Sequence, residues 1–433
     1  MAMDGKELVE KLAKLSQVQS IKDIPQLTHA LFPGTHCPLM GAAMAVGGIK
    51  DSLIVVVGTD ECTYYTKSMT IHSEKFGGID GRCVSVVLDD HDVTFGSAEK
   101  VQESFKEIIE EYRPQCVFLV TTCVIEIIGD DFDAISEGLS ELYGIPVLPV
   151  HTEHFKCEDH LPGLERTITV CAEMMKSCDS DNSVNLLGQR MGDFATTELY
   201  AMLQKAGVKI GLQLPCGCSV DDIKNAAAAK VNIVVNDIAL PLAQKMQEKF
   251  GIPYVYFNKF VIPEKIYEAY KNLFGYLELE LPGELEGLYQ NAREKIEKNK
   301  GELEGITYIY GNTPYAVFEM NCFLSSLGMV PQVIQTNRYT EAVEPYAKEI
   351  LQYTDPYVCK AANIAPLQYV YDVLSPYLYL GHEFGNRLRQ KGIAIVHSDR
   401  ASGMLGFEVT GYLLQQLVKS VREAKEYRKE LGL

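Results

Sequence analysis

Short apolar segments alternate with amphipathic segments along almost the whole chain. The residues from Ser97 to Tyr112 predict a helix, because Val101, Phe105 and Ile108 repeat at helical spacing and charged residues occupy the opposite side. The next apolar run, Cys116–Thr121, has the length and composition of a buried strand. Helices that alternate with short buried strands are typical of parallel sheets covered by helices on both faces.

Four of the predicted helices end in the same way, at a glycine that is followed directly by a strand. Glycine adopts the left-handed conformation that ends a helix at little cost. The four joints are Tyr143-Gly144-Ile145-Pro146, Ala206-Gly207-Val208, Phe250-Gly251-Ile252-Pro253 and Leu327-Gly328-Met329. They indicate a recurring helix-to-strand connection without a fixed sequence repeat.

Two changes in composition predict borders between domains. The polar run 179–183 precedes a predicted strand at Val184–Leu187, and a charged helix at about 284–300 precedes another at Ile306–Tyr310. We therefore expect three Rossmann-like, doubly wound α/β domains with mostly parallel sheets. Their expected ranges are 1–182, 183–302 and 303–433.

The composition argues against nucleic acid and membranes as partners. The 433 residues include 40 basic and 58 acidic side chains, a net charge of −18, and no basic block that would bind nucleic acid. The apolar runs are too short to cross a membrane, and the first fifteen residues lack the pattern of a secretion signal. We expect a soluble, cytoplasmic protein. Its 12 cysteines would then be free thiols, some of them available to metal.

Three cysteines stand out by their positions. Cys62 and Cys123 each follow a predicted strand, so both are expected at the carboxyl edge of one sheet, where ligands of such folds bind. Cys37 precedes a helical segment rich in small residues, at a helix start that favours a thiolate. The three thiolates could therefore meet. The alternative is that each is a small buried apolar residue.

The segments around these cysteines resemble the nitrogenase component 1 superfamily of catalytic and scaffold subunits. The resemblance is carried by Cys37 before its Gly/Ala-rich stretch, Gly58–Tyr65 around Cys62, and Thr121-Thr122-Cys123 with Ile128-Gly129-Asp130-Asp131. The stretches Val231–Asn236, Phe250–Pro253 and Ile306–Pro314 extend it over most of the chain. It implies that Cys37, Cys62 and Cys123 bind an iron-sulfur cluster at a subunit interface. It also implies a separate, ATP-hydrolysing iron protein as electron donor.

Three thiolates are one fewer than a 4Fe-4S cluster normally takes from protein. A second copy of the chain or a sister component 1 subunit could add its own cysteines around a larger, P-cluster-like centre. Alternatively, one other side chain completes a 4Fe-4S cluster. Asp60 and Glu61 stand where the family commonly has a glycine before the cysteine, so an acidic fourth ligand and two solvated carboxylates both remain open.

The family's catalytic subunit holds a second, large cofactor through a middle-domain cysteine and a late histidine. The corresponding stretches here, Val234–Asp237 and Ser402–Gly406, contain neither. Two functions therefore remain open. One is a reductase subunit that takes electrons from the ATP-dependent iron protein and reduces a small molecule or tetrapyrrole. The other is a non-catalytic beta-type or cofactor-assembly scaffold subunit. The chain itself lacks a phosphate-cradling glycine loop with its lysine.

Several further side chains are candidates for chemistry, each with a structural alternative. Cys216 and Cys218 would form a metal or redox pair, or a structural loop before a helix with the capping box Ser219–Asp222. The group His151, His154, Cys157 and His160 would line a substrate cavity, or a surface loop. His382 and His397 would donate protons, or be satisfied core histidines. The turn Gly311–Pro314 has too few glycines for a dinucleotide fingerprint.

Overall fold

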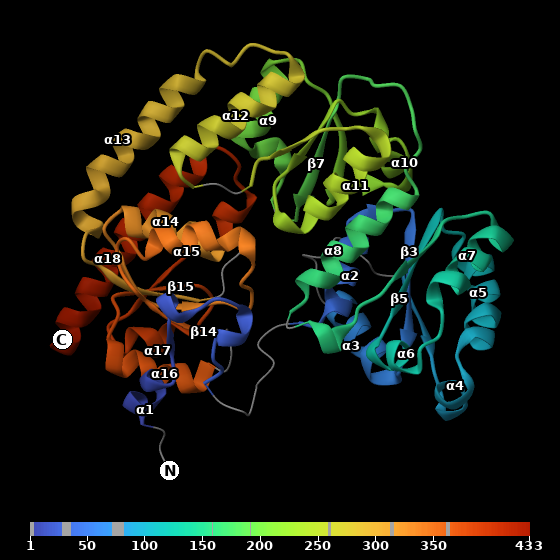
Figure 1. The fold of residues 1–433 in the computed structure, drawn as a ribbon, viewed down its shortest axis with the longest axis horizontal. Coiled ribbons are helices and arrows are strands. Elements are labelled where there is room, and N and C mark those ends of the chain that lie inside the picture. The colour runs from blue at the N-terminus through green and yellow to red at the C-terminus, as the bar shows by residue number, and fades with distance from the viewer. Residues whose placement is uncertain are drawn as a thin grey trace.

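The computed structural model describes residues 4–27, 36–71, 82–157, 159–190, 192–258, 261–311, 316–360 and 364–433. Three sheets of parallel strands, each packed against helices, make up the molecule (Figure 1). The expected fold class, Rossmann-like α/β units with mostly parallel sheets, is confirmed. Among the described residues, no helix has both the length and the apolar content needed to span a bilayer.

The N-terminal sheet has the strand order β4-β3-β5-β6, with every pair parallel. Its strands are β3 (Ser52–Gly58), β4 (Cys83–Val87), β5 (Cys116–Thr121) and β6 (Val147–Val150). Its helices are α2 (Pro38–Gly47), α3 (Asp60–Ile71), α4 (Asp90–Phe95), α5 (Ala98–Tyr112), α6 (Cys123–Ile128), α7 (Phe132–Tyr143) and α8 (Leu161–Val170). Every residue of the central strands β3 and β5 is buried, as expected for strands covered on both faces.

The middle sheet, in the order β11-β10-β7-β8, is also parallel throughout. Its strands are β7 (Val184–Gln189), β8 (Ile210–Pro215), β10 (Val231–Val234) and β11 (Tyr254–Tyr256). Its helices are α9 (Glu198–Lys205), α10 (Val220–Lys224), α11 (Leu240–Phe250), α12 (Pro263–Leu277) and α13 (Leu285–Leu303). A short parallel pair, β2 (Ile49–Lys50) with β9 (Cys218–Ser219), connects this unit to the N-terminal one.

The C-terminal sheet has the order β1-β14-β13-β12-β15-β16 and is parallel except at β1. Its strands are β1 (Ala13–Lys14), β12 (Thr307–Tyr310), β13 (Val330–Gln335), β14 (Tyr357–Cys359), β15 (Leu378–Leu380) and β16 (Ala394–Val396). Its helices are α1 (Gly5–Glu10), α14 (Val317–Ser326), α15 (Glu344–Ile350), α16 (Ile364–Leu374), α17 (Gly385–Arg389) and α18 (Glu408–Leu431).

The glycines at the four helix-to-strand joints adopt the predicted left-handed conformation. Gly144, Gly207, Gly251 and Gly328 have φ values of +68°, +72°, +73° and +79°. At Gly144 and Gly251 the glycine N–H donates to a carbonyl oxygen in the last turn of the helix. These joints explain why each strand follows its helix so closely.

The start of the chain lies on the C-terminal sheet, which corrects its expected place in a unit 1–182. Residues 13 and 14 pair antiparallel with β14, and Leu15 N–H donates to Pro356 O at 2.9 Å. Leu8, Leu15 and Ile24 are buried in the cores of this unit, and α1 and α18 lie on the same lobe in Figure 1. This N-terminal segment covers the edge of the C-terminal sheet at β14, which would otherwise be unpaired. The divisions after residues 182 and 302 stay predictions.

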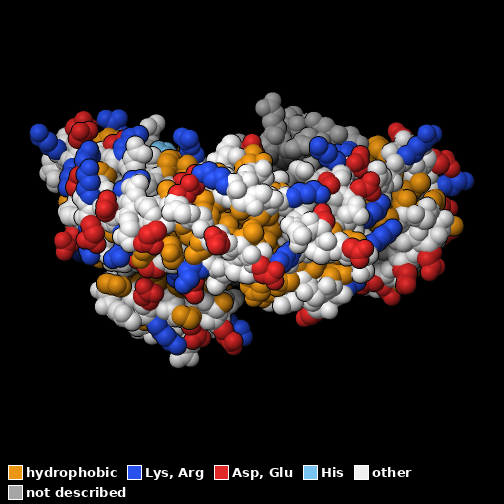
Figure 2. All heavy atoms as spheres, turned by 90° about the horizontal axis from the view of Figure 1, so that it is seen from above, with side chains coloured by type: hydrophobic (Ala, Val, Ile, Leu, Met, Phe, Trp, Pro, Cys, Tyr) orange, Lys and Arg blue, Asp and Glu red, His pale blue; other side chains and the backbone are white. Residues whose placement is uncertain are grey.

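Basic and acidic side chains are mixed on the face seen in Figure 2, and neither sign forms a continuous area there. This distribution agrees with the sequence, in which lysines and arginines are scattered. On this face the charges have the arrangement of an ordinary solvated surface.

Helices α2 and α8 cross with their backbones in contact. A methyl group on Gly41 would lie 1.9 Å from the carbonyl oxygen of His160, and one on Gly163 would lie 1.8 Å from that of Pro38. Because glycine has no side chain, the two helices approach more closely than any other residue would permit. One apolar core continues from β3 and β5 through this crossing to β7, β10 and α11.

Replacing Gly163 by Ala should therefore destabilise the protein. The added methyl must push α2 and α8 apart, and overpacking of this kind costs about 1 to 3 kcal/mol. Gly138→Ala is the matched control, because Gly138 lies on the exposed side of α7 with nothing within 4 Å of the added methyl. That variant should gain about 0.5 to 1 kcal/mol. Urea unfolding midpoints measure both, and equal midpoints for the two variants would contradict the close crossing.

Candidate metal-cluster site

Cys37 lies directly before α2, as the N-cap residue of that helix. Nine of the ten residues of α2 are buried, so the helix start is held in place by packing. The Cys37 thiol itself is only partly buried. The position therefore combines a rigid backbone with an accessible sulfur at the positive end of a helix.

Cys62 is the third residue of α3, just past the end of β3. Burial raises the pKa of its thiol, a hydrogen bond with the Thr59 side chain acts in the opposite direction, and the charge of a Cys37 thiolate raises the pKa further. Asp60 and Glu61 precede it in the first turn of α3, with exposed side chains. Carboxylates at that position interact favourably with the helix N-terminus. This observation favours the solvated carboxylates over an acidic fourth ligand.

Cys123 is the first residue of α6, just past the end of β5. Burial raises the pKa of the Cys123 thiol, and the charges of Cys62 and, less strongly, Cys37 raise it further. The end of β3 approaches closely here, since a methyl group on Gly58 would lie 2.1 Å from Thr122 Oγ1. Gly58 thus permits the two strand ends, and with them Cys62 and Cys123, to lie side by side.

The structure brings the three predicted cysteines together at one sheet edge. The charge of Cys37 raises the pKa of Cys62, and the charges of Cys62 and Cys37 raise the pKa of Cys123, so three thiolates would repel one another unless a bound cation offsets their charge. Three soft sulfur donors suit an iron-sulfur cluster. Among the described residues, no three His, Cys, Asp or Glu side chains are grouped closely enough to hold a single metal ion.

His154 also lies at this site. From the sequence we expect it in a substrate cavity or a surface loop, and not beside the cysteines. Its Nδ1 lies 3.5 Å from Cys123 Sγ, on the 3₁₀ turn His154–Lys156 that follows β6. Because β6 is adjacent to β5, the loop after β6 reaches the same edge of the sheet. That adjacency is the signal that could have identified His154. His151, from the same segment, instead forms an ion pair with Asp133 at 3.2 Å.

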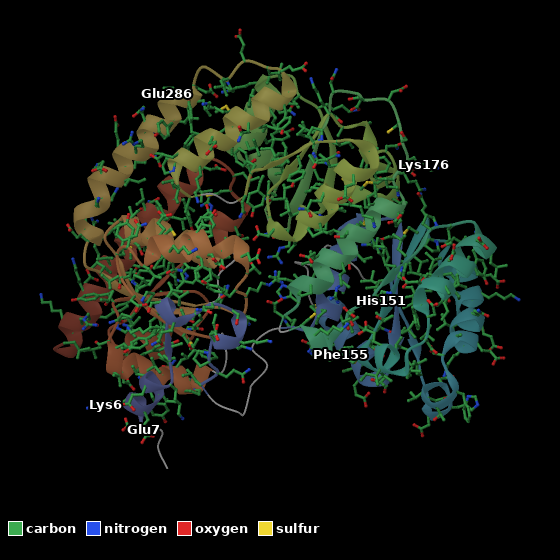
Figure 3. The ribbon with its side chains drawn as sticks, in the orientation of Figure 1. Lys6, Glu7, His151, Phe155, Lys176 and Glu286 are labelled. Atoms are coloured by element: carbon green, nitrogen blue, oxygen red, sulfur yellow. The ribbon has the colours of Figure 1, made fainter. Side chains whose placement is uncertain are left out.

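Large apolar side chains surround the thiols and remain exposed. Tyr64 on α3 is 72% exposed, Ile127 on α6 is 75% exposed, and Phe155 after β6 is 57% exposed. Figure 3 labels Phe155 and His151 on the segment that follows β6. Tyr65 is tied down by a 2.6 Å hydrogen bond between its hydroxyl and His36 Nδ1. Exposed apolar groups around a partly open set of thiols have the character of a contact surface.

A second group of side chains lies where the three units meet. His160 belongs to the start of α8, Arg190 follows β7, and Arg338 follows β13 and pairs with Asp159 at 3.4 Å. Burial lowers the pKa of His160 to about 4, aided by the charges of Arg190, His36 and Arg338 and opposed by Asp159. Its buried Nδ1 has no hydrogen-bond partner in the described part of the chain. At neutral pH this group presents a neutral imidazole beside two guanidinium cations.

The positions that correspond to the family's second-cofactor ligands are otherwise engaged. The Asn236 side chain accepts a hydrogen bond from Ile238 N–H, and Asp237 Oδ1 accepts from Tyr256 OH and Asn258 Nδ2. In the late stretch, Ser402 Oγ donates to Asp399 O at 2.6 Å. Neither place offers a cysteine or a histidine.

The remaining candidates divide between core and surface. Cys218 is buried in the core shared by the first two units, while Cys216 is half-buried with its thiol 3.3 Å from Arg190 O. The predicted capping box Ser219–Asp222 is confirmed.

His397 is exposed, so the core-histidine alternative is wrong for it, and His382 forms an ion pair with Asp399 at 3.4 Å. Residues 312–314 of the turn Gly311–Pro314 lie outside the described residues.

Residues 37–422 match the family model described as nitrogenase component 1 type oxidoreductase. The nitrogenase iron-molybdenum cofactor biosynthesis protein NifE of Clostridium pasteurianum is 31% identical over 224 residues, covering 51% of this chain and 49% of that protein. The nitrogenase molybdenum-iron protein alpha chain of Methanosarcina barkeri is 24% identical over 330 residues, covering 72% of this chain and 62% of that protein. The chain spans about half the length of the cofactor-biosynthesis relatives it matches.

A solved structure, "Nitrogenase Cp1 at pH 6.5", is similar with a TM-score of 0.78 at 14% identity. The match covers 93% of this chain and 95% of that one. At this identity the likeness concerns the fold alone. The three-unit arrangement is therefore shared over nearly the full length of both chains.

Each of the variants Cys37→Ala, Cys62→Ala and Cys123→Ala should lose most of the iron that the parent protein retains after anaerobic purification. A cluster that lacks one thiolate is open to solvent and is readily lost. Cys83→Ala is the matched control, since Cys83 is also partly buried but lies at the opposite end of the same sheet. The measurement is the iron content per chain of each variant, compared with that of the parent protein and of the control. If all three variants kept the parent's iron, these cysteines would not be ligands.

Proposed function

Because the chain belongs to the nitrogenase component 1 type oxidoreductase family, we propose that it is a cluster-binding subunit of cofactor assembly that pairs with a sister chain or a second copy. The observation that carries the proposal is the meeting of Cys37, Cys62 and Cys123 at one sheet edge, where the described residues bury none of the three thiols completely. A bound iron-sulfur cluster would supply single-electron transfer at this place. The chain's own residues would hold it and exclude water.

An interfacial position follows from the geometry of the edge. The three thiols come from the first turns of α2, α3 and α6, or from just before them, and the described residues bury none of the three completely. The exposed Tyr64, Ile127 and Phe155 would be buried by a second chain placed against this edge. Such a chain would also supply the ligands that three thiolates leave missing.

The assembly role is supported by the site where the three units meet. Arg190, Arg338 and the neutral His160 form a wall that suits an anionic metal precursor as cargo. The positions of the family's permanent ligands hold Asn236 and Asp237, whose side chains are already hydrogen-bonded. A cargo held mainly by charge can be released to another protein. Relatives named as cofactor biosynthesis proteins support the same function.

A second function remains a candidate because of the fold. The likeness to nitrogenase Cp1 extends over almost the whole chain, which suits a reductase that receives electrons from an ATP-dependent iron protein. In that case ATP hydrolysis would belong to the partner, since the chain has no phosphate-cradling glycine loop. The two functions differ in whether the loaded protein turns over a substrate or hands over its cargo.

The deciding experiment is anaerobic co-expression of the tagged chain with and without its sister gene, followed by light scattering and metal analysis. We expect a stable assembly of at least two chains, with iron in the assembly and little in any monomer. We also expect the loaded assembly to transfer metal to an apo acceptor subunit. Arg190→Ala should lower that transfer without changing the iron held by the three cysteines.

Two results would overturn the proposal. A monomer that carries its full iron stably would contradict the interfacial site. Turnover of a substrate that requires an iron protein and ATP, without any transfer of metal, would favour the reductase instead.

A further inference from the structure

A buried carboxyl group lies where the middle unit meets the C-terminal unit. Glu319, in the first turn of α14, is only 5% exposed. It interacts electrostatically with three side chains of the middle unit: Lys265 on α12, Asp237 after β10, and Tyr256 in β11. The ionisation of this one side chain therefore affects both sides of a contact between units.

The carboxyl group of Glu319 has an oxygen without a hydrogen bond. Oε1 is buried and has no partner in the described part of the chain. Lys265 Nζ lies 4.0 Å from the centre of the Tyr346 ring on α15. Cys322, almost one turn further along α14, has its thiol 3.1 Å from Tyr346 O. If Glu319 became charged, this oxygen would be a buried, unpaired part of a carboxylate, which is costly.

The surroundings place the ionisation of Glu319 in the physiological range. Burial raises its pKa to about 7, the charge of Lys265 opposes this shift, and the charge of Asp237 adds to it. Tyr256 OH and Asn258 Nδ2 both donate to Asp237 Oδ1 and hold that side chain in position. Loss of the proton from Glu319 would put a second negative charge near Asp237, across the contact.

Two other contacts between the same units contain no titratable group. Thr410 Oγ1 on α18 donates to Val261 O at 2.7 Å, just before α12. Leu199 N–H on α9 donates to Leu405 O at 3.2 Å. A change of pH leaves these two bonds in place, so they form the fixed side of a movement that starts at Glu319.

We propose that Glu319 is a proton-controlled contact, which is closed when its carboxyl group is neutral and loosened when the charged carboxylate draws in water. The contact borders the place where the three units meet, because Asp237 also acts on Glu165 of α8, which faces Arg338. Access to that place would therefore increase as the pH rises. The inference rests neither on the cysteines nor on the proposed assembly function, and its test needs no metal.

The first test is infrared spectroscopy of the full chain between pH 6.0 and 8.5, which detects the C=O stretch of a neutral carboxyl group. The parent should show such a band that disappears with a midpoint near pH 7, and Glu319→Gln should lack it. Glu341→Gln is the matched control, since it removes an exposed carboxylate of the same unit, and it should keep the band. If the parent and Glu319→Gln gave the same spectra, the proposal would be overturned.

The second test is hydrogen exchange of the peptides that contain β11 and the start of α14. The closed contact binds the proton more tightly than the open one, so the stabilisation present in acid is lost as the pH rises through about 7. The opening equilibrium should increase about tenfold from pH 6.0 to 8.5, beyond the intrinsic effect of pH on exchange. Glu319→Gln should show no such increase. A titrating band without this change would also overturn the proposal, because the acid would then be buried without controlling the contact.

Lys265→Met keeps the test decisive if Glu319→Gln fails to fold. The charge of Lys265 lowers the pKa of Glu319, so its removal should move the infrared midpoint to a higher pH. The methionine retains an apolar side chain against Tyr346. An unchanged or lower midpoint would show that the titrating acid is not Glu319, and the proposal would be wrong.

Discussion

The close crossing of α2 and α8 is the constraint on which the arrangement of this molecule depends. Gly41 and Gly163 let the two backbones touch, and the crossing joins the N-terminal sheet to the middle unit through one continuous core. It also sets the positions of two functional regions. Cys37 stands at the start of α2, and His160 at the start of α8, so a shift of either helix would move both the cluster site and the site between the three units.

The two regions differ in the sign of the charge that they present. At the sheet edge, the charge of Cys37 raises the pKa values of Cys62 and Cys123, and a cationic metal centre would relieve that repulsion. Between the units, two arginines and a neutral histidine present positive potential. On the proposed function, the first region would retain metal through sulfur, and the second would receive an anion loosely. That contrast supports the proposed role in cofactor assembly.

Much of this could be predicted from the sequence, because the signals are local. The strand Cys116–Thr121, the glycine joints and the capping box at Ser219 each follow from residues next to one another in the chain. The meeting of Cys62 and Cys123 follows from the shared direction of parallel strands. What could not be predicted is non-local. The two-residue strand β1 is too short for any periodicity, and the pairing of Arg338 with Asp159 spans 179 positions.

The most direct measurement is the position of iron in crystals of the anaerobically purified assembly, from anomalous scattering at the iron absorption edge. The account predicts iron at the contact between two chains, bonded to the sulfurs of Cys37, Cys62 and Cys123. Iron bound within a single chain and away from these three sulfurs, or a chain contact that leaves them facing solvent, would contradict it.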